Sequence, residues 1–159
     1  MKHLIAIPAL LIALMVGTSA HSADFNKGLA AYEKRDYASA LKEFQPLAEE
    51  GLDRAQFYLG KMLKMGYGVR QTYKSAVKWF VRAAEQGHAP AQTELGLLYI
   101  TKRGVKKSET LAYMWWELAA SRGNAEARSN QEIIKQRMSS AQITEAMRLA
   151  HEWEEKHKK

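Results

Sequence analysis

The residues best suited to holding a metal ion lie at the carboxyl end of the chain, in the stretch HEWEEKH from His151 to His157. On a helix, His151 and Glu155 would share one face, because they are four residues apart. A zinc site of the His-Glu-x-x-His kind needs a second histidine at that spacing, and Glu155 stands there instead. His88 lies far upstream. The pattern favours a charged helix end, and no metal is expected.

Two further signals of chemistry are weak. The stretch GYGV, which contains Gly66 and Gly68, lacks the length and the following Lys-Ser/Thr of a phosphate loop. It also follows a helical pattern, whereas a dinucleotide-binding loop follows a strand. Spacing alone identifies no serine or lysine that has both a base and an orienting partner. The sequence therefore predicts a protein that is not an enzyme and needs no cofactor.

Charge is more informative than these motifs. The whole chain has a net charge of +7, and residues 61–107 hold ten basic residues against two acidic ones. Many of the basic residues lie between predicted helices, so stacking of the helices should bring them to one edge. We call this set the basic rim: Arg70, Lys74, Lys102, Arg103, Lys106 and Lys107. One interpretation is that the basic rim binds an acidic protein segment or the anionic cell envelope. The alternative is that these charges only keep the protein soluble.

The first residues have the pattern of a secretory signal peptide. Lys2 precedes a thirteen-residue uncharged run, followed by small residues. This run is too short to anchor the chain across a bilayer of about 30 Å. We place cleavage after Ala23, with Ala20 as the alternative, so the signal peptide would be residues 1–23. The mature protein would be periplasmic or secreted, without an integral membrane segment.

The absence of cysteine excludes a disulfide framework and a lipid-modified amino-terminal cysteine. Nucleic acid is not an expected partner of an exported protein. Proteins that bind single-stranded nucleic acid also interleave aromatic residues with their cations, and we expect no such interleaving with the lysines of the basic rim.

An internal repeat organises the rest of the chain. Residues 55–90 and 91–126 share twelve identical positions, where unrelated sequences would share on the order of two or three. A period of this length is typical of a solenoid, and each unit holds two amphipathic helices, such as 53–65 and 72–86. The predicted parts are repeats at 24–52, 53–88 and 89–124, a partial repeat at 125–138 and a capping helix at 139–159.

Small residues recur within each unit. Gly60 and Gly96 lie inside predicted helices, where each costs about 1 kcal/mol relative to alanine, so a close approach of helices is expected there. The pair Ala83 and Ala84 should give a flat face on which the next helix rests. Five aromatic residues are expected to pack in the core: Trp79, Phe80, Tyr113, Trp115 and Trp116. Three residues are expected to cap helix amino termini: Asp53, Thr72 and Ser108.

The stretches AQFYLGKMLKMGYGV and SAVKWFVRAAEQGHA, with AQTELGLLY, RGV and TLAYMWWELAASRGNA one period later, resemble Sel-1-like repeats, relatives of the tetratricopeptide repeat. The first unit, from Phe25, looks more like a tetratricopeptide repeat itself. In the second copy Lys102 replaces Gly66, so its loop should turn less sharply. Cysteine-rich members have been discussed as penicillin-binding or β-lactam-cleaving proteins. With no cysteine, and with no Ser-x-x-Lys motif recognised, we do not carry that activity over.

The resemblance implies an all-α, right-handed α/α superhelical solenoid that acts as an adaptor and offers a concave surface to a partner protein. The partner would meet the face of the first helices that stays free after Ala55, Leu59 and Leu63 are buried. The candidate residues are Phe57, Tyr58, Lys61, Lys64, Met65, Thr93, Glu94, Leu97 and Thr101. The alternative function is an enzyme or accessory subunit that acts on or binds an envelope polymer such as peptidoglycan.

Overall fold

The computed structural model describes residues 23–158, and the predicted signal peptide lies outside them except for Ala23. Within this range all regular secondary structure is helical. The helices are α1 (Phe25–Glu33), α2 (Tyr37–Glu49), α3 (Asp53–Met65), α4 (Tyr73–Glu85), α5 (Ala89–Thr101), α6 (Glu109–Ser121), α7 (Ala125–Lys135) and α8 (Ser140–His157).

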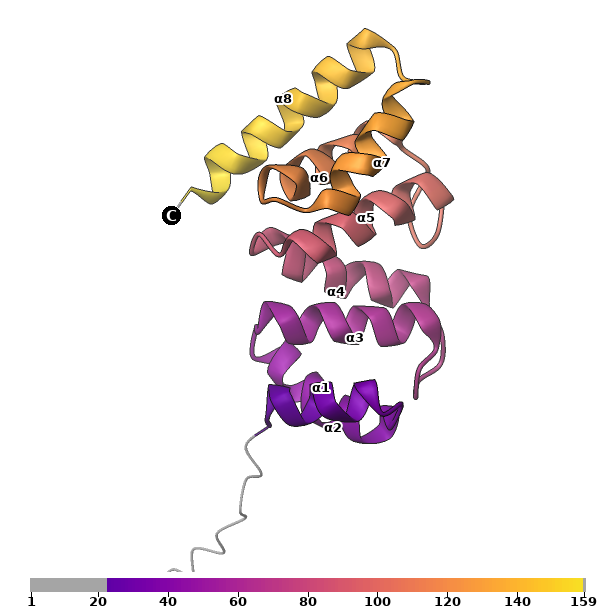
Figure 1. The fold of residues 1–159 in the computed structure, drawn as a ribbon, viewed down its shortest axis with the longest axis vertical. Coiled ribbons are helices and arrows are strands. Elements are labelled where there is room, and N and C mark those ends of the chain that lie inside the picture. Colours follow the sequence, from indigo (N-terminus) through magenta and orange to yellow (C-terminus); the bar gives the residue numbers. More distant parts are fainter. Residues whose placement is uncertain (1–22, 159) are drawn as a thin grey trace, which may run out of the picture.

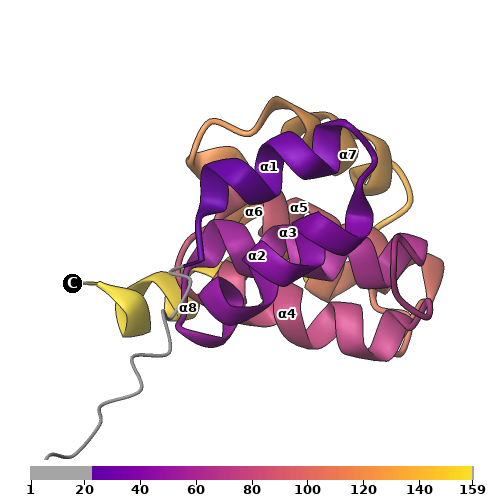
Figure 2. The same cartoon turned by 90° about the horizontal axis from the view of Figure 1, so that it is seen from below.

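The helices form hairpins that stack along one axis (Figure 1). The pairs α1–α2, α3–α4 and α5–α6 pack within units, and α2–α3, α4–α5 and α6–α7 pack between successive units. Seen along the stack, α1 and α7 lie toward one side and α4 toward the other (Figure 2). The fold is an all-α helical repeat solenoid, as the sequence predicts.

Two of the three predicted caps are present. The hydroxyls of Thr72 and Ser108 each accept a backbone N–H three residues later, at 3.4 and 3.1 Å, and so cap α4 and α6. The prediction for Asp53 is wrong. The cap position of α3 is Leu52, which offers no side-chain acceptor, and the Asp53 carboxylate accepts the adjacent N–H of Arg54 at 2.8 Å.

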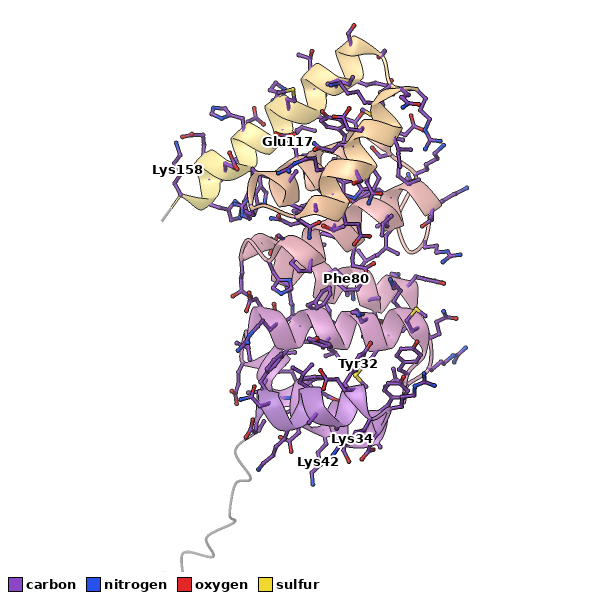
Figure 3. The ribbon with its side chains drawn as sticks, viewed as in Figure 1. Tyr32, Lys34, Lys42, Phe80, Glu117 and Lys158 are labelled. Atoms are coloured by element: carbon purple, nitrogen blue, oxygen red, sulfur yellow. The ribbon has the colours of Figure 1, made fainter. Side chains whose placement is uncertain are left out.

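The helix-interior glycines lie where the two helices of a unit touch. A Cβ atom on Gly60 would be 2.8 Å from a ring carbon of Phe80, which Figure 3 shows between α4 and α3. A Cβ atom on Gly96 would be only 2.2 Å from Nε1 of Trp116. That nitrogen donates to the backbone oxygen of Thr93 at 3.1 Å. The predicted close approach is confirmed, because even one methyl group would overlap the facing ring.

The first unit repeats this contact over a shorter distance in sequence. A Cβ atom on Gly28 would lie 2.7 Å from the Phe44 ring. These residues are 16 apart, whereas the later glycine–aromatic pairs are 20 apart, because the turn between α1 and α2 is four residues shorter. The same helix contact therefore survives a change of turn length.

Alanine and glutamine form the joints between units. Ala83 and Ala84 of α4 are fully buried, in agreement with their predicted role beneath the next helix. The side-chain amide of Gln92, on α5, donates to the backbone oxygen of Ala84 at 3.1 Å. One unit earlier, Gln56 donates to the oxygen of Ala48 at the same distance. Each joint thus pairs a buried amide with a backbone carbonyl at the end of the preceding helix.

The predicted core aromatics are buried with one exception. The buried members are Phe80, Tyr113, Trp115 and Trp116. Trp79 is only half-buried, and the guanidinium of Arg82 lies 4.6 Å from its ring centre. The repeat predicts the position of this side chain on α4, but it does not predict what covers it.

The turn after α5 keeps its shape despite the loss of glycine. Lys102 has φ 56° and ψ 35°, close to φ 75° and ψ 27° at Gly66. The expectation of a less sharply turned loop is therefore wrong. Both residues end their helix in the left-handed region, which a residue with a Cβ atom adopts at a cost in conformational energy.

The repeat pattern stops at α7. Glu132 occupies the position equivalent to Gly60 and Gly96, and it is exposed. The following helix, α8, packs mainly on α6, and Figure 1 shows it crossing the stack obliquely. Its Trp153 ring lies 6.3 Å from the ring of Trp115. Among the described residues, no helix packs on α7 as α4 packs on α3, and an exposed glutamate side chain stands at the position where such a helix would approach.

The last helix begins as predicted. Ser139 and Gln142 form a capping box, with bonds of 3.2 Å from the Gln142 N–H to the serine hydroxyl and 2.9 Å from the Ser139 N–H to the glutamine side chain. Across residues 23–158, no helix is long and apolar enough to cross a membrane.

Candidate protein-interaction surface

A depression between α3 and α5 collects five of the nine predicted binding residues. They are Lys64, Met65, Glu94, Leu97 and Thr101. The remaining lining residues are Tyr73, Leu98 and Arg103, and Arg103 belongs to the basic rim. The structure thus joins the free face of the first helices to the basic edge, two features that the sequence analysis treats separately.

An ion pair joins two of the residues that line this depression. The Lys64 ammonium lies 2.7 Å from a Glu94 carboxylate oxygen, and both side chains are about one-fifth exposed. Because these residues come from neighbouring units, the pair connects α3 to α5. Beside it, Met65 is 48% exposed, and Leu97 is half-buried. The depression therefore offers exposed apolar surface next to charged groups.

Phe57, Tyr58 and Lys61 lie on α3 in a different environment. The Tyr58 ring stacks on Phe44 at 5.0 Å and meets Tyr32 at 5.1 Å, edge to face. Phe57 packs against Phe80, with ring centres 6.0 Å apart. The Lys61 ammonium lies between 5.5 and 5.7 Å from the three rings of Tyr32, Phe57 and Tyr58. Tyr58 therefore packs between the first unit and the second, whereas Phe57 packs within the second unit and against His88 at the start of α5, with ring centres 4.9 Å apart. Partner binding by these half-buried residues stays a prediction.

Thr93 does not belong to the free face. It is 3% exposed, and its hydroxyl donates to the Ala89 oxygen at 3.0 Å. Its own backbone oxygen accepts the bond from Trp116. Without a partner bound, Thr93 is thus covered by α6 and does not lie on the free face where it was predicted.

Stacked turns place the basic rim along one edge. A Cβ atom on Gly104 would lie 2.7 Å from the Tyr73 backbone and 3.1 Å from the Lys74 nitrogen, so the turn after α5 lies against the start of α4. Gly68 has the same relation to Tyr37 one unit earlier. All six rim side chains belong to exposed residues. One of them, Lys107, has an acidic neighbour, since its ammonium is 3.4 Å from Glu109.

Aromatic residues do accompany this edge, contrary to our expectation. The Arg103 guanidinium lies 5.2 Å from the Tyr73 ring centre. Tyr67 stacks on Tyr37 at 4.4 Å, and these two line a pocket with Tyr32. Burial, followed by the neighbouring tyrosines, raises the pKa of the Tyr32 hydroxyl to about 12, so this group stays neutral. The argument against nucleic acid therefore rests on the predicted export alone.

The sequence analysis overlooked Ile133, the most exposed of the large apolar residues described, at 66%. It lies on α7, 36 residues after Leu97, and thus at the same place in the repeat. Extending the repeat comparison into α7 would have found it. We call the surface formed by Lys64, Met65, Glu94, Leu97, Thr101 and Ile133 the odd-helix face.

Two groups of residues have spacings that can suggest chemistry. Ser75 and Lys78 have a Ser-x-x-Lys spacing that the sequence analysis overlooked. The Ser75 hydroxyl lies 3.4 Å from that of Thr72, at the start of α4, and Lys78 is exposed. In the carboxyl-terminal stretch, His157 stacks on Trp153 at 4.0 Å. Within the described part of the chain, no three His, Asp or Glu side chains are grouped so as to hold a metal ion.

Comparison with known proteins shows what the repeat is similar to. Residues 53–88 and 89–124 each match the family model described as Sel1 repeat. The fold matches the crystal structure of a protective antigen present in uropathogenic Escherichia coli strains that displays an SLR fold, with a TM-score of 0.79 and 29% identity over 83% of this chain and 29% of that one. It also matches a Sel1 repeat protein from Oxalobacter formigenes, with a TM-score of 0.65 and 30% identity over 68% of this chain and 44% of that one.

The chain thus spans less than half the length of either protein. Comparison with curated protein sequences gives no match.

Proposed function

We propose that this chain, whose residues 53–124 match two copies of the Sel1 repeat model, is a protein-interaction scaffold without catalytic activity of its own. Proteins built from Sel1 repeats are generally scaffolds of this kind, and stacked hairpins offer a large extended surface. The partner segment binds along the odd-helix face, and the basic rim contributes charge at one edge.

The observation that carries this proposal is the depression between α3 and α5. It places the apolar side chains of Met65 and Leu97 beside the cations Lys64 and Arg103. An apolar side chain of the partner would displace water from the first pair, and nearby carboxylates would meet Arg103. The partner therefore contains an acidic segment with at least one exposed apolar side chain.

We place this interaction in the periplasm. The support comes from the sequence of residues 1–23, with its positive start, short apolar run and small residues. An exported protein with ten basic and two acidic residues in its central part would also be attracted to the anionic envelope. This attraction would be long-range and strongly weakened by salt.

Photo-crosslinking in cells tests the binding face. A crosslinking amino acid replaces Met65 or Ile133 on the odd-helix face and, as a matched control, Lys78, which is exposed on α4. We expect Met65 and Ile133 to capture the same protein, with mass spectrometry mapping the contact to an acidic segment, and Lys78 not to capture it. Arg103→Glu should weaken binding of that segment at least tenfold in a purified system, while the circular dichroism spectrum stays unchanged.

Two outcomes would contradict the proposal. Capture of the partner from Lys78 but from neither odd-helix position would place the interface on the other face. Turnover of purified peptidoglycan fragments by the protein would show that it is an enzyme acting on an envelope polymer.

A further inference from the structure

The two joints between units contain the same buried glutamine, but its hydrogen bonds are completed at only one of them. At the joint between the first unit and the second, Oε1 of Gln56 accepts a hydrogen bond from Nε2 of Gln86, at the end of α4, at 2.9 Å. The same nitrogen also donates to the backbone oxygen of Gly51 at 2.9 Å. A side chain at the end of the second helix therefore bridges the preceding joint.

At the joint between the second unit and the third, the corresponding acceptor has no donor. Gln92 is fully buried, and its Oε1 accepts no hydrogen bond from any described residue. The residue 36 positions after Gln86 is Arg122. Arginine carries five N–H donors where glutamine has two. Because a buried acceptor without a donor destabilises the folded state, this joint lacks a favourable contact that the first joint has.

The Arg122 side chain already lies beside this joint. A Cβ atom on Gly87, the residue equivalent to Gly51, would lie 3.4 Å from Nε of Arg122. Gly87, Arg122 and Trp153 of α8 line one open pocket. The guanidinium is therefore next to the glycine whose counterpart accepts from Gln86, and it has space in which to rotate.

Contacts with α8 and with its own helix keep Arg122 away from the acceptor. Its guanidinium carbon is 5.3 Å from the Trp153 ring centre, and Nη1 is 3.7 Å from a Glu154 carboxylate oxygen. Nη1 also donates to the backbone oxygen of Leu118 at 2.8 Å. The side chains of Arg122 and Glu154 are 32% and 42% exposed, and such solvated contacts are individually weak. A buried hydrogen bond can compete with them.

We propose that Arg122 has two positions and thereby couples α8 to the joint between the second unit and the third. In the structure it lies on Trp153. In the other position it donates to Oε1 of Gln92 and to the backbone oxygen of Gly87, as Gln86 does one unit earlier. Movement of Trp153 away from Arg122 therefore strengthens the joint.

The same two units form the depression between α3 and α5. Lys64 and Met65 come from the second unit, and Glu94 and Leu97 come from the third. The strength of the joint therefore affects how far α5 can move against α3. By linkage, a partner that requires one fixed width of the depression would also loosen the contact between α8 and Arg122. The two positions of Arg122 go beyond the proposed function and do not depend on it.

A double-mutant cycle in the full chain tests the second position. Trp153→Leu removes the aromatic face but keeps an apolar side chain on α8. If Arg122 had only the position on Trp153, Arg122→Ala would lower the folding equilibrium constant less in the Trp153→Leu background than in the unaltered protein. We expect the opposite sign, with a loss about fivefold larger in that background, because the freed guanidinium reaches the buried acceptor. Urea titrations of the four proteins measure these constants.

Gln92→Met is the matched control, because it removes the acceptor and keeps a side chain of similar length. In this background the fivefold excess should disappear. An equal or smaller loss in the Trp153→Leu background, or an excess that persists with Gln92→Met, overturns the proposal.

A crystal structure of the full-length Trp153→Leu protein gives a second measurement that does not need Gln92→Met to fold. We expect a nitrogen of Arg122 within hydrogen-bonding distance of Oε1 of Gln92. If this acceptor is bonded to a water molecule instead, or still has no donor, the second position does not exist.

Discussion

The two units at 53–88 and 89–124 are built alike inside and differ outside. In each, a helix-interior glycine meets an aromatic ring of the second helix, Phe80 in the first unit and Trp116 in the second. By contrast, Trp79 and Trp115, which hold equivalent positions on the second helices of the two units, have different surroundings. Trp79 is half-exposed beneath Arg82, whereas Trp115 is covered and lies near Trp153 of α8. The repeat therefore fixes the helix contacts, and the position of a unit in the array decides which faces stay open.

Equivalent helix ends and helix starts in the two units also have the same backbone geometry but different residues. At equivalent helix ends, Gly66 and Lys102 adopt the same left-handed conformation. At equivalent helix starts, His88 and Asn124 each accept a backbone N–H through the side chain, at 3.2 and 2.9 Å. What recurs is the geometry, which different residue types reach at different cost. Exchanging residues between the units measures these costs.

The largest effect is expected at the glycine contacts. Replacing glycine by alanine inside a helix gains about 1 kcal/mol, and overfilling a packed contact costs about 1–3 kcal/mol. Gly96→Ala must also shift Trp116, whose nitrogen bonds to Thr93, and that bond contributes about 1 kcal/mol. We expect the free energy of unfolding to fall by about 2–3 kcal/mol for Gly96→Ala and by about 1 kcal/mol for Gly60→Ala.

Urea titrations followed by circular dichroism measure both values. Lys78→Ala, at an exposed place on α4, serves as the neutral control. Equal losses at the two glycines would show that the tighter contact in the second unit relaxes freely.

A smaller effect is expected from exchanging the helix-end residues. Lys102→Gly removes the strain of the left-handed conformation but raises the conformational entropy of the unfolded chain. We expect the free energy of unfolding to rise by about 0.5 kcal/mol. Gly66→Lys should cost about 1–2 kcal/mol, because it introduces that strain, and its Cβ atom would lie 3.3 Å from the Gln71 Cβ. Thermal unfolding of both variants checks the signs. Loss of stability in Lys102→Gly would mean that the lysine side chain contributes a contact of its own.

The smallest effect is a pH dependence confined to one unit. Burial lowers the pKa of His88 below 6.5, Arg54 lowers it further, and Asp53 raises it. Because the folded state favours the neutral ring, the stability contributed by His88 is complete above pH 6.5 and is lost as the pH falls below that value. Protonation at Nδ1 would also remove the acceptor for the N–H of Ala91.

His88→Asn introduces the cap that the next unit uses and removes the titration. Unfolding free energies of the variant and the unaltered protein at pH 7.5 and 5.5 test this. We expect the variant to lose less stability between the two values, and an equal loss would assign the acid sensitivity to other groups.

Much of the fold could be predicted because the chain repeats itself. The helix at 53–65 was predicted to the residue, since the spacing of Ala55, Leu59 and Leu63 and the flanking glycines constrain the same element. The fold class follows from the repeat period. The capping role predicted for Asp53 was wrong, because Asp53 is already the first residue of the helix and Leu52 occupies the cap position.

The surface was harder to predict because it depends on contacts between units. Nothing in the α5 sequence shows that Trp116 reaches the backbone of Thr93 and buries it. The pairing of Lys64 with Glu94 depends on how far α5 is rotated against α3. The exposure of Ile133 could have been predicted, because this residue follows Leu97 by one full period of the repeat.

The exposed Glu132 on α7 stands one period after Gly96, at the point where the repeat pattern stops. A single helix that packed on α7 as α4 packs on α3 would bring its aromatic ring against a carboxylate. A complete 36-residue unit duplicated upstream of α7 would instead bring its own glycine and its own aromatic residue, so it would lengthen the scaffold without this conflict. Growth of such a protein over evolutionary time is therefore expected from the middle outward, with the terminal segment carried along unchanged.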